Sequence, residues 1–144
     1  MVLNETLRLY PPAAGIIRQA FKDLKLGEDM VIPKGVNVMV DILSVHINPK
    51  HWSDNANEFR PERFKDGVAA IASNHPMTFL PFSSGPRVYI GHTFSLLEAM
   101  LAISIILKHF KFTFSSLYRH ILVAFATTIP QHRIPIIAER VDSS

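Results

Sequence analysis

The sequence predicts an α+β fold, with short strands and small helices preceding one long helix. Residues 16–42 divide into strand-length apolar runs between turn residues, whereas residues 93–110 have helical apolar spacing. The chain has 144 residues, of which 48% are hydrophobic and 19% charged. This length suits one domain of ordinary size, and the composition supplies enough apolar surface for a folded core. We therefore expect residues 1–144 to form a single domain.

The first part of the chain alternates a helix, strands and turns. Residues 1–10 have helical spacing that ends at Pro11-Pro12. The residues that can share one helical face are Val2, Leu3, Thr6, Leu7 and Tyr10. Apolar runs predict strands at residues 16–21, 30–32 and 36–42, separated by turns at 26–29 and 33–35.

The middle of the chain is less regular. We expect a short helix over residues 44–50, an aromatic-rich irregular segment over 51–65, and a surface loop or short helix over 66–76. Residues 79–91 contain two prolines and two glycines, which predicts a loop of defined shape.

A long helix is predicted over residues 93–110, beginning near Thr93. Its apolar residues cover most of its circumference, which is typical of a helix buried in a larger body. Lys108 and His109 lie in the last turn, where positive charge suits the helix dipole. Strands are expected at residues 111–115, 124–129 and 134–138.

Charge and composition exclude several classes of function. The net charge is +3 and the basic residues are scattered, which argues against nucleic-acid binding. The sequence contains no cysteine, so disulfides, cysteine-based zinc sites and thiolate ligation are all excluded. No apolar segment reaches the roughly 18 residues that span a bilayer. The seven histidines show no metal-binding spacing.

Three motifs follow one another along the chain. Glu5 and Arg8 have i, i+3 spacing, which by itself indicates only a surface ion pair. Pro61-Glu-Arg-Phe64 supplies a further arginine in an aromatic setting. The segment Phe82-Ser-Ser-Gly-Pro-Arg-Val-Tyr-Ile-Gly91 has the pattern F-x-x-G-x-R-x-Y-x-G.

In this order and spacing, the three motifs resemble the C-terminal portion of a cytochrome P450. The segments around Arg8 and Arg63 look like those of plant microsomal members, which include hydroxylases of steroid, gibberellin and cytokinin hormones. The resemblance covers residues 2–138 and implies part of a mainly helical fold with small β-sheets. It also implies that residues 1–144 are a partial domain.

The resemblance assigns structural roles to four residues. Glu5 and Arg8 would form a buried triad with Arg63, below the haem. His46 matches a family histidine at the end of a strand, and we expect a structural role for it.

The resemblance also implies a set of haem contacts. Arg18 and Arg87 would face the haem propionates, where a planar guanidinium suits a carboxylate. Phe82 would lie beside the iron ligand, and Gly85 and Gly91 would let the backbone approach the porphyrin.

One departure from the family pattern affects the chemistry. The iron ligand of the family is a cysteine thiolate, but position 89 is tyrosine. We therefore expect this chain to be inactive as an oxygenase, with Tyr89 filling the ligand position. Three alternatives stay open: a non-catalytic binding or interaction module, tyrosinate ligation by Tyr89, and histidine ligation by His92.

The family's partners follow from the same resemblance. They are haem with its iron, NADPH-cytochrome P450 reductase and a small hydrophobic substrate, at the cytosolic face of the endoplasmic reticulum. The family's oxygen-activating helix and membrane anchor are expected upstream of residue 1. Expressed alone, the chain would then be cytoplasmic.

Overall fold

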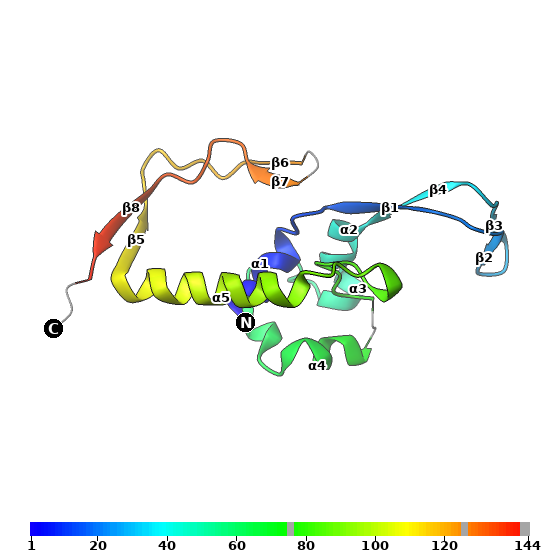
Figure 1. The fold of residues 1–144 in the computed structure, drawn as a ribbon, viewed down its shortest axis with the longest axis horizontal. Coiled ribbons are helices and arrows are strands. Elements are labelled where there is room, and N and C mark those ends of the chain that lie inside the picture. Colours follow the sequence, from blue (N-terminus) through cyan, green and yellow to red (C-terminus); the bar gives the residue numbers. More distant parts are fainter. Residues whose placement is uncertain (75–76, 125–126, 142–144) are drawn as a thin grey trace. The chain divides into compact units, whose positions relative to one another are not determined.

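The computed structural model of the chain describes residues 1–74, 77–124 and 127–141. It contains two compact units, Met1–Pro81 and Phe82–Ser144. Helices and small antiparallel sheets occur in both units (Figure 1), which confirms the predicted α+β class. Whether residues 1–144 behave as one domain stays a prediction.

The helices of the first unit are short. They are α1 (Val2–Leu9), α2 (Ile42–His46), α3 (Pro49–Trp52), the 3₁₀ helix η1 (Pro61–Phe64) and α4 (Gly67–Asn74). Asp41 caps α2 by accepting a hydrogen bond from the Ser44 amide, and Asn48 caps α3 through the Lys50 amide. The Asn48 cap and Pro49 start a second helix at residue 49, which explains why the predicted helix over residues 44–50 is divided in two.

The strands of the first unit form two nested antiparallel pairs. Strand β1 (Gly15–Gln19) pairs with β4 (Asn37–Asp41), and β2 (Leu24–Leu26) pairs with β3 (Met30–Ile32) between them in the chain. Strand β2 was not predicted. Gly27, at φ 64°, adopts the left-handed conformation that a tight turn requires, and this turn brings Leu26 opposite Met30.

The core of the first unit is aromatic. Trp52, Ala56 and Phe64 are buried, and the half-buried Ile71 and Phe79 pack against them. The Phe64 and Phe79 ring centroids lie 5.0 Å apart, and those of Trp52 and Phe64 lie 6.0 Å apart. The segment predicted as irregular therefore supplies the core, with Trp52 and Phe64 as its anchors.

The second unit contains a 3₁₀ turn, one long helix and two further strand pairs. After η2 (Gly85–Arg87) comes α5 (His92–His109), within one residue of the predicted bounds. Strand β5 (Phe110–Phe114) pairs with β8 (Ile136–Arg140), and β6 (Leu122–Ala124) pairs with β7 (Thr128–Pro130). The strand predicted over 124–129 falls partly on residues 125–126, outside the described residues.

The prediction that the long helix is buried is wrong for this chain. No residue of α5 is buried, and large apolar side chains such as Phe94 and Leu101 are more than half exposed. The reason is that α5 carries apolar residues on every side, while its own unit offers only narrow strand pairs. Across the described part of the chain, no helix has the length and apolar character needed to cross a membrane.

Candidate functional site

Arg8 and Glu5 form a buried, bidentate ion pair on α1. Arg8 Nε donates to Glu5 Oε2 and Arg8 Nη2 donates to Glu5 Oε1, each at 2.8 Å. Both side chains are fully buried. The i, i+3 spacing, which by itself indicates only a surface pair, here places a parallel fork of charge-assisted hydrogen bonds inside the first unit.

The rest of the Arg8 guanidinium binds the backbone of distant segments. Nη1 donates to the carbonyls of His46 and Ala56, at 2.7 and 2.6 Å, and Nη2 donates to that of Glu58 at 3.1 Å. All five N–H groups of Arg8 therefore have acceptors. The guanidinium also lies 4.9 Å from the Trp52 ring centroid, a cation–π distance. Arg8 thus joins α1 to α2 and to the loop after α3.

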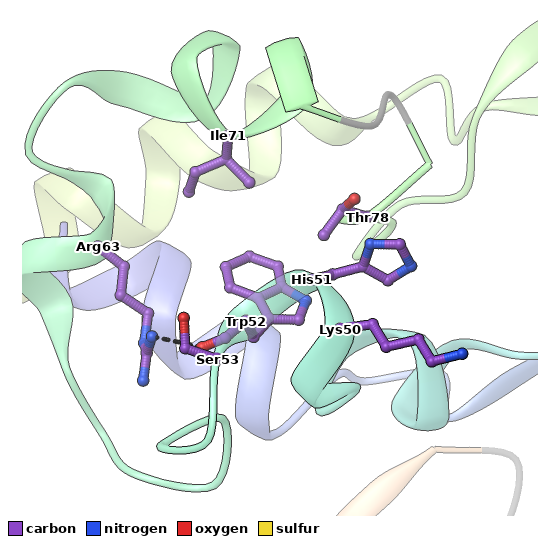
Figure 2. Close-up of a pocket in the computed structure, with 7 residues that line it drawn as sticks. All are labelled: Lys50, His51, Trp52, Ser53, Arg63, Ile71 and Thr78. Atoms are coloured by element: carbon purple, nitrogen blue, oxygen red, sulfur yellow. Dashed lines mark hydrogen bonds between the residues drawn. The ribbon is translucent and has the colours of Figure 1, made fainter.

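Arg63 lies beside this pair and has a different set of partners. Its Nη1 donates to the Trp52 carbonyl (Figure 2, dashed line), and its Nη2 donates to Asn55. Its Nε lies 3.5 Å from Glu5 Oε1, which is an ion pair but too long for a well-formed hydrogen bond. The structure therefore brings together all three residues of the expected triad, with Arg8 bonded more closely to Glu5 than Arg63 is.

His46 is fully buried in the same cluster, and its contacts fix its protonation. The Leu80 amide donates to Nε2 at 2.7 Å, so Nε2 must be the unprotonated nitrogen. Nδ1, which lies 3.0 Å from the Arg8 carbonyl, must then carry the proton and donate. Burial lowers the pKa of His46 to about 4, and the nearby Arg8 charge also lowers it. A neutral His46 thus links α1 to the backbone two residues before Phe82.

The Glu5 carboxylate is kept ionised by its surroundings. Burial by itself would raise the pKa of Glu5, but hydrogen bonds from Arg8 and from the Arg60 amide, with the charges of Arg8 and Arg63, outweigh it. The net result is a pKa below the ordinary value. The cluster therefore contains one anion, two cations and a neutral imidazole.

The second unit begins with the loop that carries the third motif. The Tyr89 amide donates to the Phe82 carbonyl at 3.0 Å, and the Val88 amide donates to the Gly85 carbonyl at 3.0 Å. Gly85 has φ 74°, a conformation that favours glycine, and Ser83 also has a positive φ of 66°. The two hydrogen bonds close the loop on itself.

Tyr89 occupies the outer surface of this loop. Its ring stacks on Phe82, with centroids 6.0 Å apart and planes 16° apart, and 54% of the residue is exposed. The end of its side chain turns toward Gly91, where a Cβ would lie about 3 Å from the phenol oxygen. A Cβ at position 91 would therefore require the end of the exposed Tyr89 side chain to shift.

His92 is held in place by its neighbours. Its Nδ1 donates to the Tyr89 carbonyl at 3.0 Å, so Nε2 accepts from the Thr93 hydroxyl at 3.1 Å. Both ring nitrogens are therefore engaged, which disfavours His92 as a metal ligand. The first residue outside the helix is Gly91 rather than the predicted Thr93, and it makes no side-chain cap.

The two arginines expected at the haem propionates are both exposed. Arg18 lies on β1, where Nη1 donates to the Ile17 carbonyl at 3.1 Å, and Arg87 ends η2. Their proposed contacts with a haem stay predictions.

These residues do not fit a thiolate-ligated haem. The donor at the ligand position is a phenol, the sequence has no cysteine, and Tyr89 is stacked against its own loop. Among the described residues, no three histidine or acidic side chains gather as a metal site would require.

Sequence reasoning missed several members of the buried cluster. The carbonyls of Ala56 and Glu58, the Arg60 amide and the Trp52 ring all contact Glu5 or Arg8. Backbone groups carry no residue-type signal, so no pattern could have identified the first three. Trp52, as the single tryptophan in an aromatic segment, was the one member with a visible signal.

Comparison with known proteins identifies the protein family in which these motifs occur. The family model described as Cytochrome P450 matches residues 1–128. A cytokinin hydroxylase of Arabidopsis thaliana is 40% identical over 141 residues, covering 98% of this chain and 27% of that protein. An 11-oxo-beta-amyrin 30-oxidase of Glycyrrhiza uralensis is 42% identical over 140 residues, covering 97% of this chain and 26% of that protein.

The chain thus spans about a quarter of the length of the curated relatives that it matches. The match nevertheless extends across nearly all of the chain, including the buried ionic cluster and the loop of the second unit. The chain belongs to the cytochrome P450 family.

Proposed function

We propose that this chain is the haem-loop region of a cytochrome P450 monooxygenase in which Tyr89 has replaced the thiolate ligand. In this proposal residues 1–144 form one partial domain, and the chain does not activate oxygen by itself. The observation that carries the proposal is the phenol at position 89 in a chain without cysteine. A phenol cannot supply the electron donation by which a thiolate favours O–O cleavage.

The family-level surroundings of such a region form part of the proposal. They are haem, NADPH-cytochrome P450 reductase, a small hydrophobic substrate and the cytosolic face of the endoplasmic reticulum. Support comes from family membership and from relatives whose names describe hydroxylation and oxidation. Arg18, Arg87, Phe82, Gly85 and Gly91 remain the proposed haem contacts.

The test uses the full chain reconstituted with haem, reduced and exposed to carbon monoxide. We expect no red-shifted, thiolate-type Soret band from the native sequence, and no peroxide-supported hydroxylation of laurate above that of the denatured chain with the same haem. Hydroxylation above that background would contradict the proposed inactivity.

A matched pair of variants then isolates the ligand position. Tyr89→Cys supplies a thiolate, whereas Tyr89→Ser supplies a side chain of similar size without one. If the loop otherwise retains its haem-binding shape, Tyr89→Cys should show the thiolate band and Tyr89→Ser should not. Failure of both variants to bind haem would count against the haem-loop assignment.

A second candidate, haem ligation by tyrosinate, is favoured by the exposure of Tyr89 and by the lack of any hydrogen bond to its hydroxyl among the described residues. Tyr89→Phe distinguishes it, because this variant removes only the oxygen. A haem spectrum that is unchanged by Tyr89→Phe would eliminate the candidate.

A further inference from the structure

The first unit contains a pocket of about 400 Å³, and all of its lining residues belong to that unit (Figure 2). It is formed by α3 and the residue after it, by η1 and α4, and by the segment that leads to Pro81. The residues that line it are Lys50, His51, Trp52, Ser53, Arg63, Ile71 and Thr78. A volume of this size suits a small organic molecule.

Trp52 presents an unused hydrogen-bond donor in this pocket. Trp52 is 4% exposed, and its indole Nε1 has no hydrogen-bond partner in the part of the chain that the structure describes. Figure 2 shows that nitrogen on the side of the ring toward His51, Lys50 and Thr78. A buried N–H without an acceptor is unfavourable, so an acceptor placed here would be bound preferentially.

The charge of the lining selects the kind of acceptor. Lys50 is an exposed cation at the edge of the pocket, and none of the described lining residues is acidic. The Arg63 guanidinium adds positive charge to the wall. Because it already donates to the Trp52 and Asn55 carbonyls, it does not offer a ligand a free pair of N–H groups. An anionic acceptor is therefore favoured over a neutral one.

The remaining wall is partly apolar, because His51, Ser53 and Thr78 are polar whereas Ile71 is not. The Trp52 ring and Ile71 offer hydrocarbon surface next to the indole N–H. A compact inorganic anion would leave this surface wet, whereas an organic anion would cover it.

From these observations we propose that the pocket binds a small organic carboxylate. One carboxylate oxygen accepts a hydrogen bond from the Trp52 indole, the Lys50 ammonium offsets its charge, and its apolar body contacts Ile71. This site involves neither Tyr89 nor a haem, so its test is independent of the test of the proposed function.

The chain has one tryptophan, which makes the donor directly observable. In a ¹⁵N–¹H spectrum of the full chain, the single indole signal should move downfield and saturate as sodium benzoate is added at constant ionic strength. Benzyl alcohol, with the same ring and no charge, and inorganic phosphate, with charge and no ring, should each bind at least roughly tenfold more weakly. Equal binding of either probe, or a shift that sodium chloride reproduces, overturns the proposal.

A pair of lysine variants tests the charge. Lys50→Met should weaken benzoate binding roughly tenfold, because a cation of the pocket lining is lost. Lys25→Met removes an exposed lysine on β2, outside the pocket, and should leave the affinity unchanged. Equal effects of the two variants would show that benzoate responds only to net charge, and would overturn the site.

Discussion

The two units of this chain differ in whether the residues of their sequence motifs are buried. In the first unit, Glu5, Arg8 and His46 are fully buried and bonded to one another or to backbone. In the second, Tyr89 and its neighbours are exposed, and α5 buries none of its apolar residues. The ionic cluster needs only partners within its own unit, whereas the loop and helix present surfaces that their own unit does not cover. A substitution in the cluster of the first unit should therefore lower the free energy of unfolding strongly, whereas a substitution in the loop of the second unit should lower it only slightly.

The largest expected effect is that of Arg8→Lys. Lysine keeps the charge but offers three N–H groups in place of five, so buried acceptors lose their donors. We expect a loss of about 2–5 kcal/mol in the free energy of unfolding of the first unit, because each buried acceptor left without a donor costs about 1–3 kcal/mol. Urea titration followed by Trp52 fluorescence measures it.

Arg60→Lys is the matched control for that measurement. Arg60 is exposed and contacts Glu5 through its backbone amide, which the substitution retains. Its effect should stay within about 0.5 kcal/mol. Similar losses of unfolding free energy in the two variants would show that the buried contacts of Arg8 stabilise the first unit no more than an exposed arginine does.

The next effect is a pH dependence that arises from His46. Its pKa falls from 6.5 in the unfolded chain to about 4 in the folded one, so the unfolded state binds the proton more readily. Stability from this group is complete above pH 6.5 and is lost as the pH falls toward 4. Between pH 7 and 5 the loss should be about 2 kcal/mol.

His46→Gln removes the titrating group but keeps an acceptor for the Leu80 amide. Its unfolding free energy should vary less over the same pH window than that of the native chain. An unchanged slope in His46→Gln would rule out His46 as its origin.

In the second unit the expected effects are smaller and depend on one contact. Gly91→Ala places a Cβ about 3 Å from the Tyr89 ring, which must then leave Phe82. In the Tyr89→Ala background the same substitution meets no ring. We expect a coupling free energy of about 1 kcal/mol in the double-mutant cycle, measured by hydrogen exchange of the α5 backbone amides in the native chain. Strict additivity would mean that the Tyr89 ring does not lie against Gly91.

This contrast also explains what could be predicted from the sequence. The spacing of Glu5 and Arg8 and the long apolar pattern of α5 are local signals, and both led to the right element. Burial depends on partners outside the element, so the sequence overestimated it for α5 and could not reveal the carbonyls around Arg8. The tautomer of His46 likewise follows from Leu80, 34 residues away, and from no local pattern.

The smallest effect should be that of Tyr89→Phe. The Tyr89 hydroxyl has no hydrogen-bond partner among the described residues, and the ring that stacks on Phe82 is retained. The unfolding free energy of the second unit should therefore change by less than about 0.5 kcal/mol. Tyr89→Ala is the control that removes the stack, and it should cost about 0.5–1.5 kcal/mol. If Tyr89→Phe costs as much as Tyr89→Ala, the hydroxyl has a structural partner, and position 89 is a structural anchor like Arg8 rather than an exposed replacement for a ligand.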